Sequence, residues 1–171
     1  MRIETERLII TEFTKDMAQV VHENSLDEDN RRFVPDEVFE TVDEAMETIE
    51  FLMSRYESED GPFVYPVLTK TGDNIGYVQL APIEEGWEIG YHIAKKYTGN
   101  GYATEAVRTF LHFIAGRKSL DSVYGICLKE NVASVKVMEK CGFENLFVGV
   151  GDYQGESCEI VRNIWKNDGR E

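Results

Sequence analysis

The chain has 171 residues, of which 42% are hydrophobic and 29% charged, and these are the proportions of an ordinary globular protein. Its formal net charge of −14 at pH 7 argues against nucleic acids and anionic membranes as partners, because both would be repelled. No apolar run approaches the roughly 20 residues of a membrane-spanning helix. We expect residues 1–171 to form a single domain with a core of its own.

The N-terminus and the cysteines predict the cellular location. The segment from Met1 to Arg7 is charged where a secretory signal would be apolar. Cys127, Cys141 and Cys158 are an odd number of thiols and lack the spacing of metal ligands. This pattern predicts reduced cysteines, a cytoplasmic protein and no metal site.

The first half of the chain predicts two helices and four strands. Residues 3–13 are rich in β-branched and apolar side chains and predict the first strand. Thr14 and Asp16 offer N-cap chemistry for a short helix, and a polar loop broken by Pro35 follows. A second helix is predicted from Thr41, where Thr-Val-Asp-Glu is a capping-box pattern. Further strands are predicted, with turns between them, at residues 63–68, 75–83 and 87–94.

The second half of the chain predicts two more helices and three more strands. The helices are expected at residues 101–116 and 131–141, and the strands at 120–128, 143–150 and 156–165. The chain shows no repeats, linkers or low-complexity segments. We expect an α+β fold with a mixed, mostly antiparallel central sheet of about seven strands, flanked by about four helices.

A glycine turn follows the strand at 87–94 and opens directly into the next helix. It reads Thr98-Gly99-Asn100-Gly101. The first N–H groups of a helix have no partner within the helix and carry a partial positive charge. Because glycines keep side chains away from these groups, the turn predicts a seat for a phosphate or pyrophosphate.

Two common phosphate-binding motifs do not fit this turn. A dinucleotide-binding fingerprint needs a third Gly or Ala where this chain has Thr104, and a parallel βαβ unit where hairpins are predicted. Asp121 lies only loosely where a ribose-binding acid would be expected. A P-loop would need Gly-Lys-Ser/Thr, which does not follow the turn. A nucleotide-binding oxidoreductase is therefore a disfavoured alternative.

Two blocks of sequence together resemble the GCN5-related N-acetyltransferases (GNAT). The block Thr98 to Ala103 is similar to the family motif Gln/Arg-x-x-Gly-x-Gly/Ala, except that Thr98 replaces Gln or Arg. The block Asn131 to Phe143 is similar to a second family pattern, which begins with Asn and ends with Glu-Lys-x-Gly-Phe. The resemblance covers nearly the whole chain and is strongest to the branch that includes ribosomal-protein N-terminal acetyltransferases.

The resemblance implies that acetyl-CoA binds as the co-substrate. Its pyrophosphate would lie on the amides of the glycine turn. Its pantetheine arm would pair with the end of strand 87–94, which is expected to splay from strand 120–128 and leave a slot. Asn131 would donate or accept a hydrogen bond with this arm, cap the following helix, or do both. The implied cofactor-binding residues are Ile93, Ala94, Gly99, Asn100, Gly101, Tyr102, Ala103, Thr104, Asn131 and Ser134.

Acetyl transfer to an amine needs a base, a donor for the tetrahedral oxyanion and a proton for the departing thiolate. Glu88 is the leading candidate for the base, and His92, on the same face of the strand, is the second. Many family members have a tyrosine that acts as the general acid where this chain has Met138. The ribosomal-protein branch resembles this chain in having a serine near the sulfur, so Ser134 is the candidate that hydrogen-bonds the thiolate. A backbone N–H near Ile93 would hold the oxyanion.

The acceptor of the acetyl group is the part of the function that the sequence specifies least. The resemblance implies a primary amine, either a protein N-terminus or a small cationic amine. Residues 26–60 hold 13 acidic side chains against three arginines, which favours a cationic amine or a basic peptide. We expect the acceptor to bind near residues 25–40, the second helix and the last hairpin. The aromatic candidates there are Phe33, Phe39, Tyr153 and Trp165.

An alternative function from another class is a catalytically silent acetyl-CoA-binding module that regulates a partner. Such a module would keep the glycine turn and lose the base and the acid. Met138 favours this alternative, whereas Glu88 and Ser134 oppose it. A homodimer through the last two strands is also compatible with the sequence.

Overall fold

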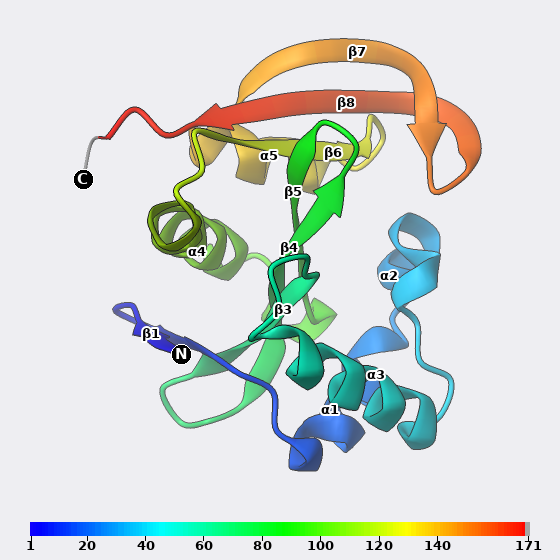
Figure 1. Cartoon of the computed structure of the whole chain (residues 1–171). Helices are drawn as coiled ribbons and strands as arrows, with labels where there is room; N and C mark the ends of the chain where they lie inside the picture. The colour runs from blue at the N-terminus through cyan, green and yellow to red at the C-terminus, as the bar shows by residue number, and fades with distance from the viewer. Residues whose placement is uncertain (170–171) are drawn as a thin grey trace.

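A mixed sheet of eight strands forms the centre of the molecule (Figure 1). The computed structural model describes residues 1–169 of the chain. Across the sheet the order is β1-β2-β3-β4-β5-β6-β8-β7, and every pair is antiparallel except β5 with β6. The strands are β1 (Arg2–Glu4), β2 (Leu8–Thr11), β3 (Phe63–Thr69), β4 (Asn74–Ile83), β5 (Gly86–Ile93), β6 (Ser122–Leu128), β7 (Glu144–Tyr153) and β8 (Glu156–Lys166). The predicted mixed, mostly antiparallel sheet is confirmed.

The prediction of one continuous strand at residues 3–13 is wrong. Two short strands, β1 and β2, pair as a hairpin in which Ile3 lies opposite Ile10. Their turn is closed by the N–H of Thr5, which donates to the carbonyl of Leu8 at 2.9 Å, and by the N–H of Leu8, which donates to the Thr5 hydroxyl at 2.9 Å. The polar Thr-Glu-Arg segment thus turns the chain, and the sheet gains an eighth strand.

Five α-helices and three single 3-10 turns accompany the sheet within residues 1–169. The helices are α1 (Ala18–Ser25), α2 (Glu28–Phe33), α3 (Val42–Arg55), α4 (Tyr102–Lys118) and α5 (Val132–Lys140), and the 3-10 turns are η1 (Lys15–Met17), η2 (Pro35–Glu37) and η3 (Lys95–Tyr97). Four of the helices agree with the prediction. None of them is long and apolar enough to cross a membrane, judged over residues 1–169.

Helix α2 lies in the segment for which the sequence predicts only a polar loop. Six residues are too few to show a helical period, so the missed signal is its cap: the carboxylate of Asp27 accepts the N–H of Asn30 at 2.6 Å. The cap predicted at Thr41 is confirmed, because its hydroxyl accepts the N–H of Glu44 at 3.1 Å. The cap predicted at Thr14 is not, since its side chain contacts Asp16 instead of a backbone N–H of the turn.

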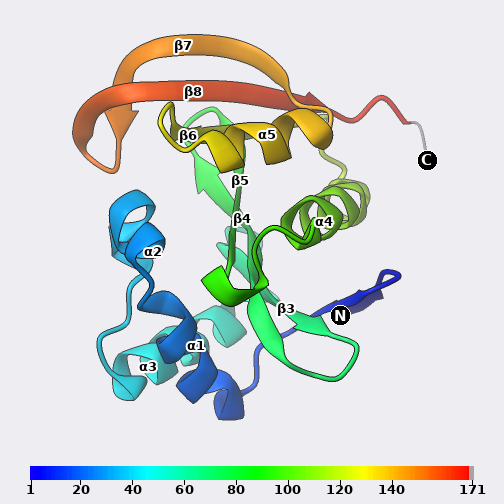
Figure 2. The same ribbon diagram turned by 180° about the vertical axis from the view of Figure 1, so that it is seen from behind.

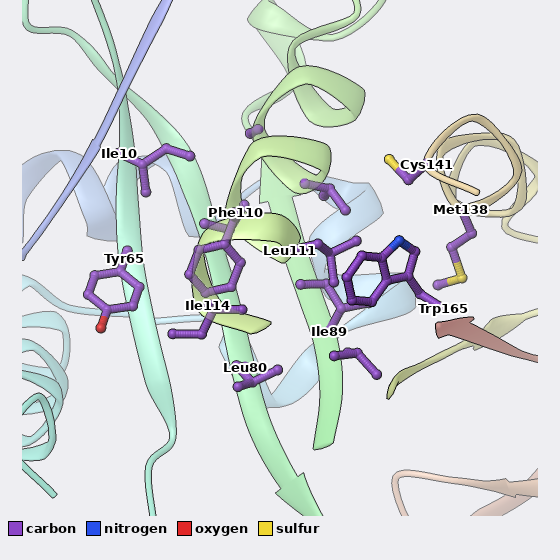
Figure 3. Close-up of a cluster of buried hydrophobic side chains, with 14 of the residues drawn as sticks. Ile10, Tyr65, Leu80, Ile89, Phe110, Leu111, Ile114, Met138, Cys141 and Trp165 are labelled. Carbon is purple, nitrogen blue, oxygen red and sulfur yellow. The ribbon is translucent and has the colours of Figure 1, made fainter. Parts of the chain in front are cut away.

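Two apolar clusters hold the helices against opposite faces of the sheet (Figures 1 and 2). Alternation along β3 sends Phe63, Tyr65 and Val67 toward α4 and sends Val64 toward α1 and α3. Figure 3 shows the larger cluster, in which α4 side chains such as Phe110 meet the strands. Helix α5 joins this face, so the molecule has three layers with the sheet in the middle.

The sheet opens where β5 meets β6. The only register pair between these parallel strands, within the described chain, joins Glu88 to Tyr124. By contrast, β4 pairs with β5 from Gly76 to Ile83, and β6 pairs with β8 along its whole length. The predicted splay is therefore confirmed, and it leaves backbone groups of β5 free to bind another extended chain.

Candidate active site

The glycine turn presents the N-terminus of α4 to the surface. Gly99 and Gly101 both have φ of +79°, a left-handed conformation that glycine adopts without a steric penalty. The first helical hydrogen bond runs from the N–H of Glu105 to the carbonyl of Gly101 at 3.1 Å. The amides just before it, those of Tyr102 and Thr104 among them, belong to the first turn and have no helical partner. The turn therefore has the geometry of the predicted anion seat.

Side chains within the turn fix its shape instead of covering it. The side-chain amide of Asn100 donates to the carbonyls of Tyr97 and Thr98 at 3.1 and 3.2 Å. The hydroxyl of Thr98, at the position where the family has Gln or Arg, donates to the carbonyl of Lys95 at 2.7 Å. Thr98 thus closes η3.

Arg7 braces the turn from the β1–β2 hairpin, a role that sequence reasoning missed. Its guanidinium donates to the carbonyl of Asn100 at 2.8 Å and pairs with Glu105 at 2.6 Å. The same group lies 4.6 Å from the centre of the Tyr102 ring. Glu105 also accepts the hydroxyl of Thr5 at 2.6 Å. Because Arg7 and Glu105 are 98 residues apart, no local sequence pattern could have revealed this link.

A groove of about 490 Å³ begins at the glycine turn and runs between β5 and α5. It brings together most of the residues predicted to bind the cofactor, namely Ile93, Gly99, Gly101, Tyr102, Ala103, Thr104, Asn131 and Ser134. Three lysines, Lys95, Lys136 and Lys140, also line it. Cations beside a helix N-terminus suit a phosphorylated ligand.

Two of the predicted cofactor residues lie outside this groove. The N–H of Ala94 donates to the carbonyl of Ile75 at 2.8 Å, and its own carbonyl accepts the N–H of Tyr97 at 2.8 Å. Ala94 is also only 4% exposed, so its backbone is committed to the fold. Asn100 acts within the turn, as described above.

Asn131 lies at the junction between the groove and the gap in the sheet. Its side chain accepts the N–H of Ser134 at 3.2 Å and so caps α5. It also lines both the groove and a second hollow of about 380 Å³ between β5 and β6. The structure thus bears out the capping role and places Asn131 where the groove and the second hollow meet.

Glu88 lines this second hollow, called here the slot, at the point where β5 and β6 separate. Burial raises the pKa of its carboxyl group to about 7, although the guanidinium of Arg162 opposes the shift. A carboxyl group with this pKa is divided between its acid and base forms near neutral pH. The role of Glu88 as the base stays a prediction.

Ser134 and Tyr91 form a pair of hydroxyl groups where the groove enters the slot. The Ser134 Oγ lies 2.6 Å from the Tyr91 Oη, and both residues line both hollows. Burial raises the pKa of Tyr91, which keeps its phenol protonated. Sequence reasoning did not assign Tyr91 a role. It lines the slot together with Met138, the residue at the sequence position of the family's tyrosine.

Glu37 is a second acidic residue that sequence reasoning missed. It lies in η2 and lines the slot together with Glu88. Burial raises its pKa to about 7, and the nearby charges of Asp36 and Glu88 add to the shift. One of its oxygens accepts the side-chain amide of Gln79 at 3.3 Å. A motif search could not find this residue, because η2 reaches the slot only through the tertiary fold.

His92, the second predicted base, has a carboxylate partner. Its Nε2 lies 3.0 Å from the Oδ2 of Asp27, the residue that caps α2. Burial lowers the pKa of His92, against the attraction of Asp27. This contact ties α2 to β5, so the geometry supports a positioning role for His92 better than a role as the base.

The four aromatic residues predicted to bind the acceptor separate into two groups. Phe33 lines the groove, Tyr153 lines the slot, and Phe39 lines a third hollow beneath α1 and α3. The hydroxyl of Tyr153 donates to the carbonyl of Phe33 at 2.5 Å and so joins the β7–β8 hairpin to α2. Trp165 is instead 6% exposed and packs in the core against α4 (Figure 3), so its predicted place at the acceptor site is wrong.

A metal centre finds no support in the described part of the chain. Within residues 1–169, no three His, Cys, Asp or Glu side chains are grouped so that they could hold a metal ion.

Comparison with known proteins identifies acetyltransferases as similar to this chain. A family model described as an acetyltransferase (GNAT) domain matches residues 7–144. An uncharacterized N-acetyltransferase of Bacillus subtilis (strain 168), YnaD, is 30% identical over 145 residues, which cover 83% of this chain and 82% of that protein.

Solved structures agree in fold over nearly the full length. A GNAT-family acetyltransferase from Bacillus anthracis superposes with a TM-score of 0.82 at 25% identity and covers 97% of this chain and 98% of its own. RimL, a ribosomal L7/L12 alpha-N-protein acetyltransferase in complex with coenzyme A, superposes with a TM-score of 0.84 over 99% of this chain and 100% of its own. The identity to RimL is 15%, so this likeness shows the fold alone.

Proposed function

Since the chain belongs to the GNAT family of acetyltransferases and uses acetyl-CoA as its co-substrate, we propose that it acetylates a primary amine by direct attack on the thioester. The acceptor is a peptide N-terminus or a small cationic amine, and no covalent enzyme intermediate forms. One observation carries the proposal: the buried carboxyl group of Glu88 and the hydroxyl pair of Ser134 and Tyr91 line one slot, at the end of the groove that begins at the glycine turn.

Each end of the site has its own task in binding acetyl-CoA. The amides of the glycine turn receive the pyrophosphate, and the open edge of β5 near Ile93 receives the pantetheine arm as another strand would be received. This arrangement carries the thioester into the slot beside Ser134. A backbone N–H near Ile93 then lies on the same strand as Glu88 and serves as the donor to the oxyanion.

The chemistry divides between the two sides of the slot. Glu88 removes a proton from the attacking ammonium, directly or through a water molecule, because its pKa of about 7 leaves a large fraction ionised at neutral pH. As the carbon–sulfur bond breaks, Ser134 donates a hydrogen bond to the departing thiolate. Tyr91 holds the Ser134 hydroxyl at 2.6 Å. The nitrogen loses its second proton to solvent as the carbon–sulfur bond breaks, and the thiolate takes up a proton from solvent. The products are an acetylated amine and coenzyme A with a free thiol.

The acidic surroundings and a structural neighbour support a cationic acceptor. Glu37, Asp152 and Glu88 line the slot, and none of its described lining residues is a lysine or arginine. The structural neighbour RimL is named as an acetyltransferase of a ribosomal protein. These observations support an amine that is positively charged before the reaction.

The direct test follows the release of free thiol from acetyl-CoA with a panel of amines and N-terminal peptides. We expect acceptor-dependent release, with loss of the signal in the E88Q variant. Tight binding of acetyl-CoA without thiol release for any acceptor would contradict this function and would favour the silent regulatory module.

A second copy of the chain is the proposed partner of the sheet edge. Strand β7 lies at the edge and exposes four large apolar side chains, Leu146, Phe147, Val148 and Val150. Edge strands of this kind pair readily with another chain, and two copies of β7 can pair antiparallel about a twofold axis. Light scattering should give the mass of a dimer, and the V150K variant should give that of a monomer.

We also propose that the whole chain acts as one acetyltransferase domain in the cytoplasm.

A further inference from the structure

A third hollow of about 230 Å³ lies between α1, α3 and the sheet, outside the cofactor groove. Its walls are mostly apolar, and they include Phe13, Val21, Phe39, Ile49, Leu52 and Val64. A cavity of about 150 Å³ lined by such side chains is large enough to hold benzene. The hollow is therefore of a size to hold a phenyl or branched alkyl group.

Polar atoms without partners gather at this hollow. Five buried side-chain polar atoms lack a hydrogen-bond partner within residues 1–169. Four of them belong to residues that line the hollow, namely Asn30 Oδ1, Glu37 Oε2, Asn74 Nδ2 and Tyr77 Oη. Asn30 is only 2% exposed and Asn74 is 8% exposed. Buried polar groups are nearly always paired, so these atoms show that the polar side chains in the wall around Glu37 do not satisfy one another.

The charged residues of the lining favour one sign of charge in a ligand. Asp36 and Glu37 line the hollow, and no lysine or arginine is among its described lining residues. A carboxylate in an apolar setting, with one oxygen free, complements a cation that can donate several hydrogen bonds. A primary ammonium group is such a cation.

Two residues connect the hollow to the slot where the proposed chemistry takes place. Glu37 and Gln79 line both, and Gln79 Nε2 donates to Glu37 Oε1 at 3.3 Å. An ammonium group held by the Glu37 side chain would thus lie where the hollow meets the slot that contains Glu88. The remainder of the same molecule then extends away from the reacting atoms, into the apolar hollow.

We propose that this hollow, called here the side-group pocket, binds the apolar substituent of the acceptor while Glu37 holds its ammonium group. The acceptor is then a primary amine with one compact apolar group, of the size of phenyl or 3-methylbutyl. This inference rests on the acetyltransferase function proposed above and narrows its substrate class. A polyamine would instead place a second charge among apolar side chains, where no described carboxylate other than Asp36 and Glu37 could receive it.

Thiol release with matched amines tests the size and polarity of the pocket. We expect kcat/KM for 2-phenylethylamine and 3-methylbutylamine to exceed that for ethanolamine and putrescine by at least about tenfold. Burial of one or two additional methylene groups is enough to produce a ratio of this size. The T48W variant places a large ring at the pocket wall, since Thr48 of α3 lines it. It should raise KM for 2-phenylethylamine about tenfold and leave the rate with ethanolamine unchanged. The matched control E47W, at the neighbouring exposed position of the same helix, should behave as wild type.

A second variant and a binding measurement separate the pocket from the chemistry. E37Q should raise KM for 2-phenylethylamine with little change in kcat, whereas binding of uncharged toluene, followed by NMR, should be the same as in wild type. Binding of 2-phenylethylamine that T48W removes, without acetylation of any amine, would support the pocket and overturn the proposed acetyltransferase function. Acetylation that prefers putrescine and is unaffected by T48W would overturn the pocket and leave that function standing. If neither 2-phenylethylamine nor toluene bound to the wild-type protein, the side-group pocket would be refuted, and water would be its only occupant.

Discussion

The two ends of the active site are built in different ways. At the proposed cofactor end, the glycine turn and the first turn of α4 are contiguous in sequence and present backbone amides to the groove. At the acceptor end, Glu37, Glu88 and Tyr153 come from η2, β5 and β7, and they present side chains.

This difference separates what is general in the reaction from what is specific. A backbone seat accepts any ligand with the same pyrophosphate, so it suits a co-substrate that is shared by a whole family. Buried side chains with shifted pKa values can be changed one at a time, and each change alters the base or the shape of the acceptor site. Variants of the acceptor end should therefore change turnover or the KM of the amine, and variants of the cofactor end should change the affinity for acetyl-CoA.

The largest effect is expected at Glu88. The E88Q variant keeps the shape of the side chain and removes the base, so kcat should fall by about 10²- to 10⁴-fold. The dissociation constant of acetyl-CoA, measured by calorimetry, should stay within about twofold of wild type. An E88Q variant that turns over normally would assign the base to another group.

A smaller loss of turnover is expected at the hydroxyl pair. A hydrogen bond to a charged group contributes about 1.5–3 kcal/mol, so S134A should lower kcat about 10- to 100-fold. Y91F removes the neighbouring phenol and should lower kcat by a similar or smaller factor, because Ser134 Oγ loses its 2.6 Å partner. If S134A left kcat unchanged, its role as donor to the thiolate would be refuted.

Substitutions in the glycine turn should change the affinity for acetyl-CoA and leave kcat unchanged. An alanine at Gly101 would have to adopt a φ of +79°, at a penalty of about 1–2 kcal/mol, so G101A should weaken acetyl-CoA binding about 5- to 30-fold. The matched control is G72A in the β3–β4 turn, where φ is +92° and a Cβ would meet no atom within 4 Å. G72A should lower the melting temperature without weakening acetyl-CoA binding.

The smallest effect is expected at the brace beneath the turn. R7M removes the bond to the carbonyl of Asn100 and the pair with Glu105, and should raise the acetyl-CoA dissociation constant about 3- to 10-fold. R2M, which removes an exposed pair with Glu4, is the control and should leave it unchanged. Equal behaviour of the two variants would show that the turn needs no brace.

The same contrast explains which features the sequence predicted. The glycine turn and the capping role of Asn131 are local patterns, so they were readable, and so was the α+β order of elements. Glu37 and Arg7 reach their places through contacts across 42 and 98 residues, and such contacts leave no periodic or spaced signal. Tyr91 was hidden for another reason. Alternation places it on the opposite face from Glu88, and only the gap beside β6 lets both residues line one slot.

The pH dependence of acetyl transfer tests the central claim most directly. The rate at saturating acetyl-CoA and amine should be low in acid and rise to a plateau through a pKa of about 7, because the ionised carboxylate of Glu88 is the active form. E37Q should keep this rise, since Glu37 is expected to act on amine binding, and E88Q should lose it. A rise through pH 7 that persists in E88Q, or a rate that falls as the pH increases through this range, would contradict the account.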